Sequence, residues 1–179
     1  FSFVYTPSVA DIAAGTVTIK VVTNNPLGSP CRQDTNTFTL TLKPIPVINA
    51  GIDTLLNCTR TTLNLNATSS IAGTTYAWSN GTNTATNAVA SPNTYTVTGT
   101  ANGCTATDAV VVTQDITPPA VNAGIDTVLN CVRTSLVLQA TSTTTGATFA
   151  WSNGTNTANN TISTPNTYTV TATNPANGC

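Results

Sequence analysis

Five cysteines are the residues of this 179-residue chain with the clearest capacity for covalent chemistry. Histidine is absent, and the six acidic residues are all aspartates, so the commonest general base and every serine–histidine or cysteine–histidine nucleophile are missing. A glycosidase could use two carboxylates, but Asp53 and Asp126 are equivalent positions in two copies of a repeat. We therefore expect a protein that is not an enzyme and that binds no cofactor.

Metal binding is the second chemistry to weigh. The chain has neither a Cys-x-x-Cys spacing nor a histidine, which disfavours zinc. Asp115 and Asp126 could supply oxygens to a calcium ion, but calcium needs several more ligands than two carboxylates. The simpler interpretation is that Asp115 accepts backbone hydrogen bonds in a turn, and we expect no metal site.

The cysteines are ordered by an internal repeat with a period of 73 residues. The phrase AWSNGTNTA at Ala77–Ala85 returns unchanged at Ala150–Ala158. The same offset relates further positions, namely Cys58 and Cys131, Trp78 and Trp151, Pro92 and Pro165, and Tyr95 and Tyr168. The chain therefore holds two copies of one domain.

Proline-containing stretches separate the copies. Thr41–Gly51 and Gln114–Pro119 each carry two prolines, which favour short extended linkers. We predict the C-terminal part of a preceding immunoglobulin-like domain at residues 1–45, a complete repeat at 46–117, and a second copy without its last strand at 118–179. This organisation leads us to expect that the sequence is an internal piece of a longer chain.

Each copy reads as a series of short strands. Threonine, a β-branched residue that suits strands, is abundant, and apolar and polar residues alternate in segments such as Leu63–Ser69 and Asn93–Thr100. Asn-Gly pairs supply the turns between strands. We predict an all-β protein built from tandem immunoglobulin-like β-sandwich domains. Its core anchors would be the repeated aromatic residues Trp78, Trp151, Tyr95 and Tyr168, with the two tyrosines either bonding upstream backbone or only filling the core.

The repeat also suggests how the cysteines pair. We expect Cys58 to bond to Cys104 in one copy and Cys131 to Cys179 in the other. Cys31 would then be unpaired within this sequence, with its partner upstream. Disulfides persist in oxidising surroundings, so we expect an extracellular protein.

Charge and hydropathy exclude two kinds of partner. Charged residues make up 6% of the chain and the net charge is −1, which offers no electrostatic attraction for nucleic acid or anionic lipid. No run of 18 apolar residues occurs, so we expect no insertion into a membrane.

Several phrases carry a family resemblance, namely NAGIDTVLNC, ATFAW, PNTYTVTATNPANGC and VTQDITPPAVNAG. They resemble the tandem immunoglobulin-like or PKD-like repeats of long Bacteroidetes surface proteins, which include gliding-motility adhesins and other cargo of type IX secretion. The segment Tyr5–Asn25 looks like another repeat type of the same proteins. The resemblance implies export to the bacterial cell surface and an extended arm or filament used in adhesion. SNGTNT stands where PKD domains have an acidic stretch, so no calcium role carries over.

The resemblance also implies a modification. Proteins of that phylum carry O-linked glycans on an Asp-(Ser/Thr)-apolar motif, which Asp53-Thr54-Leu55 and Asp126-Thr127-Val128 match. Thr54 and Thr127 are therefore candidate glycosylation sites, and the alternative is that they are ordinary threonines at strand edges.

Three hypotheses for function follow. The first is a non-catalytic array of repeats that forms the stalk or filament of a bacterial adhesin, with neighbouring domains of the same chain, identical chains in a filament, or surface polysaccharide as partners. The second is a carbohydrate-binding accessory module of a secreted enzyme, which would need exposed aromatic side chains such as an exposed Trp78. The third is a self-assembling extracellular fibre subunit in which a neighbour supplies missing strands.

Overall fold

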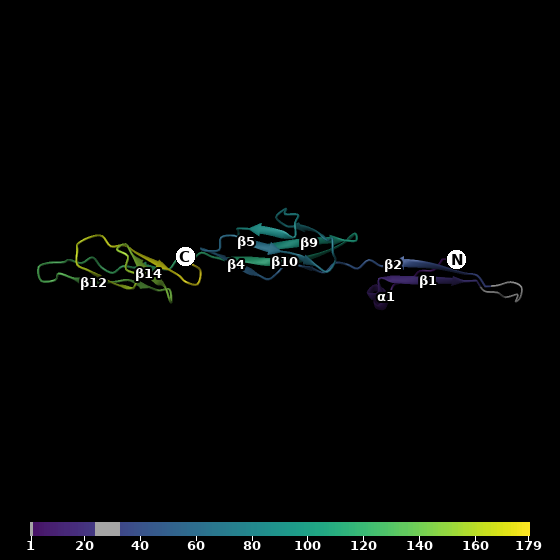
Figure 1. Cartoon of the computed structure of the whole chain (residues 1–179), viewed down its shortest axis with the longest axis horizontal. Coiled ribbons are helices and arrows are strands. Elements are labelled where there is room, and N and C mark those ends of the chain that lie inside the picture. The colour runs from purple at the N-terminus through teal and green to yellow at the C-terminus, as the bar shows by residue number, and fades with distance from the viewer. Residues whose placement is uncertain (1, 24–32) are drawn as a thin grey trace. The chain divides into compact units, whose positions relative to one another are not determined.

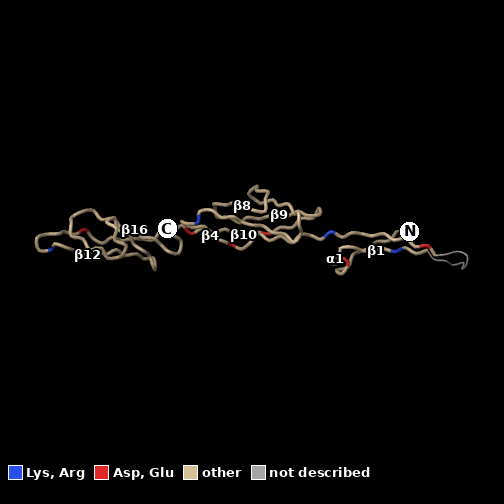
Figure 2. The backbone as a smooth tube through the Cα atoms, in the orientation of Figure 1, with Lys and Arg blue, Asp and Glu red and all other residues tan. Residues whose placement is uncertain are grey.

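The computed structural model describes residues 2–23 and 33–179, and Cys31 lies outside these ranges. Strands account for 44% of the described residues and helix for 4%, which confirms the all-β prediction. The sandwich arrangement itself stays a prediction. Figure 1 shows the elements in chain order. Figure 2 shows that charged residues are few along the described part of the backbone.

The chain forms two compact units, both discontinuous in sequence. One comprises Phe1–Ala50, Ala67–Ala85 and Thr96–Asp108, and the other comprises Gly51–Asn66, Thr86–Tyr95 and Ala109–Cys179. The division passes through the first copy of the repeat, so it does not follow the linkers that the sequence suggested. The boundaries at 45/46 and 117/118 stay a prediction.

The first element is a short helix, α1 (Val9–Ala14), which begins and ends at well-formed caps. Ser8 and Asp11 form a capping box, and Gly15 ends the helix with a φ of 71°, a left-handed conformation that glycine adopts without cost. Nothing helical in the described ranges has the length and apolar character needed to cross a membrane.

The helix is followed by an antiparallel pair, β1 (Thr16–Val22) and β2 (Thr35–Thr41), in which Val17 lies opposite Leu40 and Ile19 opposite Phe38. Phe38 is 64% exposed and Val21 is 57% exposed. This two-stranded ribbon therefore leaves apolar side chains uncovered.

The first copy of the repeat contains eight strands. In chain order they are β3 (Ile48–Asn49), β4 (Thr54–Asn57), β5 (Leu63–Asn66), β6 (Thr68–Ser69), β7 (Thr75–Trp78), β8 (Thr86–Val89), β9 (Asn93–Ala101) and β10 (Cys104–Asp115). A four-stranded sheet has the order β4-β10-β9-β7, and β3 pairs with β6 and β5 with β8. Strand β4 runs parallel to the end of β10, with Asn57 opposite Asp115.

The second copy contains fewer strands. They are β11 (Val121–Asn122), β12 (Leu136–Gln139), β13 (Thr141–Ser142), β14 (Thr148–Trp151), β15 (Asn159–Ile162) and β16 (Val170–Thr173), paired β11-β13, β12-β15 and β14-β16. Residues 127–130, the counterpart of β4, form no strand. The reason is that β4 gains its hydrogen bonds from β10, and no counterpart of β10 is present in the sequence.

The repeated phrase after each tryptophan forms a loop that returns to the indole. Trp78 and Trp151 are each 4% exposed. The Trp78 indole Nε1 donates to the carbonyl oxygen of Thr84 at 3.0 Å, and Trp151 Nε1 donates to that of Thr157 at 3.0 Å. In both copies the loop formed by SNGTNT therefore supplies the buried indole N–H with its hydrogen-bond partner.

The tyrosines anchor a different part of each copy. Tyr95 is 6% exposed, and its hydroxyl donates to the carbonyl oxygen of Ser91, four residues upstream, at 3.0 Å. Tyr168, which is half-buried, makes the same bond to Thr164 at 3.0 Å. Both tyrosines thus bond to upstream backbone, as in a tyrosine corner.

Candidate functional site

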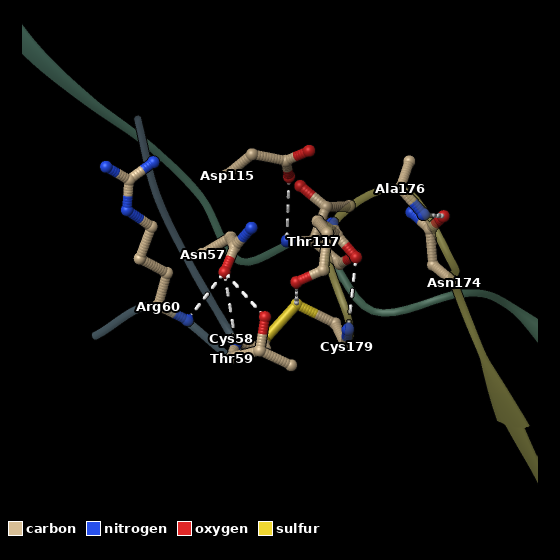
Figure 3. Close-up of a disulfide and its surroundings, with 10 residues drawn as sticks. Asn57, Cys58, Thr59, Arg60, Asp115, Thr117, Asn174, Ala176 and Cys179 are labelled. Atoms are coloured by element: carbon tan, nitrogen blue, oxygen red, sulfur yellow. Dashed lines mark hydrogen bonds between the residues drawn. A yellow bond between two sulfur atoms is a disulfide. The ribbon is translucent and has the colours of Figure 1, made fainter. Parts of the chain in front are cut away.

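The feature that stands out is a cystine that joins the two copies of the repeat. Cys58 follows β4 in the first copy, and Cys179 follows β16 in the second. Their sulfur atoms are 2.00 Å apart, their Cα atoms are 5.1 Å apart, and 121 positions separate them in the sequence. Figure 3 shows the bond between the turns that carry the two cysteines.

A side-chain cap fixes the turn that carries Cys58. The Asn57 Oδ1 atom accepts hydrogen bonds from the backbone N–H of Thr59 at 3.1 Å and of Arg60 at 2.7 Å. The Asn57 N–H donates to the carbonyl oxygen of Arg60 at 3.0 Å. These bonds turn the chain out of the strand and present Cys58 at the surface.

The turn that carries Cys179 is closed by its own backbone. The N–H of Asn174 donates to the carbonyl oxygen of Cys179 at 2.7 Å, and the N–H of Gly178 donates to that of Asn174 at 2.8 Å. Gly178 has a φ of 73°, and a Cβ atom at this position would overlap the Thr59 side chain. Glycine is therefore needed here for both its conformation and its size.

Asn177 connects three segments at the junction. Its side chain is 1% exposed, and its Nδ2 donates to the carbonyl oxygen of Thr117 at 3.0 Å. Its Oδ1 accepts from the N–H of Cys179 at 3.1 Å, and its carbonyl oxygen accepts from the N–H of Cys58 at 3.1 Å. The two cysteines and the linker are thus held to one buried asparagine.

Asp115 lies beside this junction, at the end of β10 (Figure 3). Its carboxylate accepts from the N–H of Thr117 at 3.1 Å. That bond, together with the side chain of Asn177, holds the pKa of Asp115 below the usual value of an aspartate. The turn role expected for Asp115 is therefore present, and nowhere in residues 2–23 and 33–179 do three or more His, Cys, Asp or Glu side chains gather.

The expected pairing of the cysteines within each copy is wrong. Cys104 begins β10, and Asp115, at the other end of that strand, lies opposite Asn57, next to Cys58. Eleven residues of strand span about 36 Å, whereas bonded cysteines have Cα atoms less than about 7 Å apart. Cys58 and Cys104 therefore lie at opposite ends of one long strand and cannot bond.

The other expected pair, Cys131 with Cys179, is replaced in the same way, because Cys179 is bonded to Cys58. Cys104 is a half-buried free thiol and Cys131 is an exposed free thiol. The similar spacing of the two predicted pairs had suggested two equivalent bridges. The spacing carried no information about which ends of the strands the cysteines occupy.

A cavity of about 400 Å³ opens in the second copy, lined by residues that include Leu136, Leu138, Trp151 and Tyr168. The equivalent leucines of the first copy, Leu63 and Leu65, are only 6% and 5% exposed. In the first copy β10 contributes two buried side chains, Val110 at 0% exposure and Val112 at 2%. The cavity thus marks the place that a counterpart of β10 would occupy, and Asp126 is the one acid in its lining.

The two candidate glycosylation sites differ in exposure. Thr54 is half-buried in β4, and its carbonyl oxygen accepts from the Thr113 hydroxyl at 3.3 Å. Thr127 is exposed and lies outside any strand. Asp53, in the same motif, accepts from the N–H of Val111 at 2.8 Å. Thr127 is therefore the more accessible acceptor.

Sequence reasoning missed Asn177 and a second buried asparagine, Asn160. Asn160 is 0% exposed and exchanges hydrogen bonds with the Asn153 side chain at 2.9 and 3.2 Å. Asn177 was interpreted only as part of an Asn-Gly turn. A signal for Asn160 was available, because it lies two residues before Ile162 in β15 and therefore on the same, inward side of the strand.

No known protein family matches this chain, and no curated protein is significantly similar to it.

Proposed function

We propose that this chain is part of a non-catalytic array of repeats that forms the stalk or filament of a bacterial cell-surface adhesin. The observation that carries the proposal is the Cys58–Cys179 bond, which joins one copy of the repeat to the next. A module that binds or converts a small ligand has no need of such a bond between copies. A stalk under tension does, because the bond opposes separation of the copies.

The mechanical consequence can be stated as a length. When the chain is pulled by its ends, force passes from Cys58 directly to Cys179, because 121 positions of sequence are bypassed by the cystine. An unfolded chain reaches at most about 3.5 Å per residue, so the bond shortens the maximum extended length of the chain by about 400 Å. The cystine thus limits how far the array can lengthen.

The composition fits an extracellular array. A disulfide persists where the surroundings are oxidising, and the exposed surface carries few charges. Trp78 is buried rather than displayed on a flat face, which disfavours the carbohydrate-binding hypothesis. The other partners proposed for the stalk are neighbouring domains of the same chain, identical chains, and surface polysaccharide.

Pulling single molecules tests the mechanical part of the proposal. The oxidised chain should show a final contour about 400 Å shorter than the chain treated with a reductant, whereas a Cys58→Ser variant should have the long contour under both conditions. Equal contours for oxidised and reduced wild-type chains would contradict the proposal.

Labelling of cells tests the location and role. Antibodies raised against the chain should bind intact cells of the source organism without permeabilisation. Removal of one copy from the encoded protein, residues 118–179 for example, should weaken attachment by shortening the stalk. Labelling that requires permeabilised cells would exclude a stalk at the cell surface.

A further inference from the structure

The turn that presents Cys58 is built a second time around Cys131. Asn130 Oδ1 accepts from the N–H of Val132 at 2.9 Å and of Arg133 at 2.8 Å. The Asn130 N–H donates to the carbonyl oxygen of Arg133 at 3.0 Å, as Asn57 does to Arg60 at 3.0 Å. Cys131 is nevertheless a free and exposed thiol. One of two equivalent turns is thus bonded, and the other has the same form with no bond.

The residue next to Cys131 resembles the one next to Cys58, but no Asn-Gly-Cys turn in the described part of the chain covers it. In the formed junction the Thr59 side chain lies over Gly178, where a Cβ atom would overlap it. The residue equivalent to Thr59 is Val132, whose side chain has the same branched shape and is 95% exposed. At that exposure the Val132 side chain is almost uncovered by its own copy and is open to contact from another repeat.

The opposite half of a junction is present elsewhere in the chain. Asn102-Gly103-Cys104 repeats the sequence of Asn177-Gly178-Cys179. A Cβ atom placed at Gly103 would meet nothing within 4 Å, whereas Gly178 is covered by Thr59. Cys104 is a free thiol at the end of β10 that lies away from Cys58. This second Asn-Gly-Cys turn thus offers an uncovered glycine beside a thiol.

We propose that Cys131 is a bonding site for the cysteine of an Asn-Gly-Cys turn from a further repeat of this kind, and that Cys104 is the matching site for the Cys58-type turn of another. Each repeat would then be joined to the next by one cystine that crosses between them. The partner has one chemistry, a thiol next to an Asn-Gly pair, and two sources: a repeat in the same polypeptide or a second copy of the chain.

Bond formation is an ordinary thiol–disulfide exchange. A Cys131 thiolate attacks one sulfur of an oxidised glutathione molecule and releases one glutathione thiolate. The partner thiolate then attacks the mixed disulfide at the Cys131 sulfur and releases the second glutathione. Two protein thiols lose two protons and two electrons, and one glutathione disulfide becomes two thiols.

The first experiment oxidises the chain itself with a glutathione redox buffer and maps the cystines after trypsin. Cleavage follows Lys20, Arg32, Arg60 and Arg133, which leaves Cys104 and Cys131 together in the peptide 61–133. We expect 33–60 bonded to 134–179 within one molecule, and 61–133 of one molecule bonded to 61–133 of another. The single variants Cys104→Ser and Cys131→Ser identify the bonded cysteines. If Cys104 bonds to Cys131, neither variant alone forms this cystine. A mixture of the two variants forms it once, between Cys131 of the first and Cys104 of the second.

The second experiment adds a repeat. A second copy of residues 105–179 is added to the C-terminus, directly after Cys179. In the original chain the same residues follow the equivalent cysteine, Cys104. We expect Cys131 to bond to the cysteine at the new C-terminus within one molecule, and Cys58–Cys179 to persist. A link within the extended molecule assigns the partner to the same polypeptide, and a link formed only between molecules assigns it to a second copy.

Two results would overturn the inference: thiols of Cys104 and Cys131 that stay free in both experiments, or symmetric Cys131–Cys131 dimers that survive in the Cys104→Ser variant. The inference concerns bonding between repeats and does not depend on adhesion. Failure of cell labelling would leave the cystine map unchanged, and failure of the map would leave the pulling result on Cys58–Cys179 unchanged.

Discussion

The side-chain Nδ2 of Asn177 donates to the carbonyl oxygen of Thr117 at 3.0 Å, 60 positions earlier in the chain. Thr117 belongs to the linker between the copies, and Asn177 belongs to the turn that carries Cys179. The hydrogen bond therefore ties the linker to the cystine. A disulfide that closes so long a loop is expected to stabilise the chain by about 5 kcal/mol, provided that its turn is held in place.

Replacing Asn177 should make the Cys58–Cys179 disulfide easier to reduce. Asn177→Ala removes the bonds to Thr117 and to the N–H of Cys179, while the backbone bond from Cys58 remains. Two side-chain hydrogen bonds contribute about 1–3 kcal/mol together, so the cystine should be reduced at a lower concentration of glutathione. The measurement is the fraction of Cys58–Cys179 at equilibrium across a series of glutathione redox buffers.

Asn102→Ala is the matched control. Asn102 occupies the same place in the other Asn-Gly-Cys turn and is exposed. This variant should leave the equilibrium of the Cys58–Cys179 bond where it is in the wild type. Equal shifts in both variants would mean that the bonds of Asn177 contribute nothing specific to the junction.

The two glycines of these turns should differ in the same way. Gly178 and Gly103 have positive φ angles of 73° and 82°, so alanine at either position costs about 1–2 kcal/mol of conformational free energy. Gly178→Ala carries a further cost, because its Cβ would overlap Thr59, whereas the space at Gly103 is open. Gly178→Ala should therefore lower the urea midpoint more than Gly103→Ala.

A double substitution isolates the contact. Thr59→Ala removes the atoms that a Cβ at position 178 would overlap most closely. The Thr59→Ala, Gly178→Ala pair should recover part of the lost stability, which gives a favourable coupling energy in a double-mutant cycle. Strictly additive effects would show that the two side chains do not meet.

The local structure of each copy could be predicted from the sequence because it depends on short-range patterns. Alternation in Asn93–Thr100 predicted β9, and the Asn-Gly pairs predicted turns, one of which follows each tryptophan. Tyr95 and Tyr168 were expected either to bond upstream backbone or to fill the core, and both make the backbone bond. The hydrogen-bond partner of each of these tryptophans and tyrosines lies within six residues of it.

The pairing of the cysteines could not be predicted, because it depends on which end of the sheet each one occupies. Parallel pairing of β4 with the last four residues of β10 places Cys58 beside the linker. Sequence spacing does not distinguish this register from one that would bring Cys58 close to Cys104. Asn177 was missed for the same reason, since its partner Thr117 lies across the junction.

The missing counterpart of β10 should make one substitution cost different amounts in the two copies. Leu65 is 5% exposed, whereas its equivalent, Leu138, is half-buried and lines the open cavity. Leu65→Ala should destabilise by about 2–5 kcal/mol, and Leu138→Ala by less than about 2 kcal/mol. Hydrogen exchange of the β5–β8 and β12–β15 amides reports each copy separately. Equal losses of protection would mean that the uncovered leucine is as well packed as the covered one.

Acid should weaken the junction through Asp115. Its folded-state pKa lies below the usual aspartate value because the Thr117 N–H donates to the carboxylate and the polar side chain of Asn177 also favours the charged form. A depressed pKa gives stability that is fully present above the unfolded pKa of about 3.9 and is lost as the pH falls through the folded pKa. Asp115→Asn keeps an acceptor for Thr117 but does not ionise, so the wild type should exceed this variant in urea stability by a constant margin above about pH 5, and the margin should shrink below about pH 4. A margin that is the same at pH 3 and pH 6, or one that grows in acid, would show that the carboxylate charge does not hold the linker at the cystine.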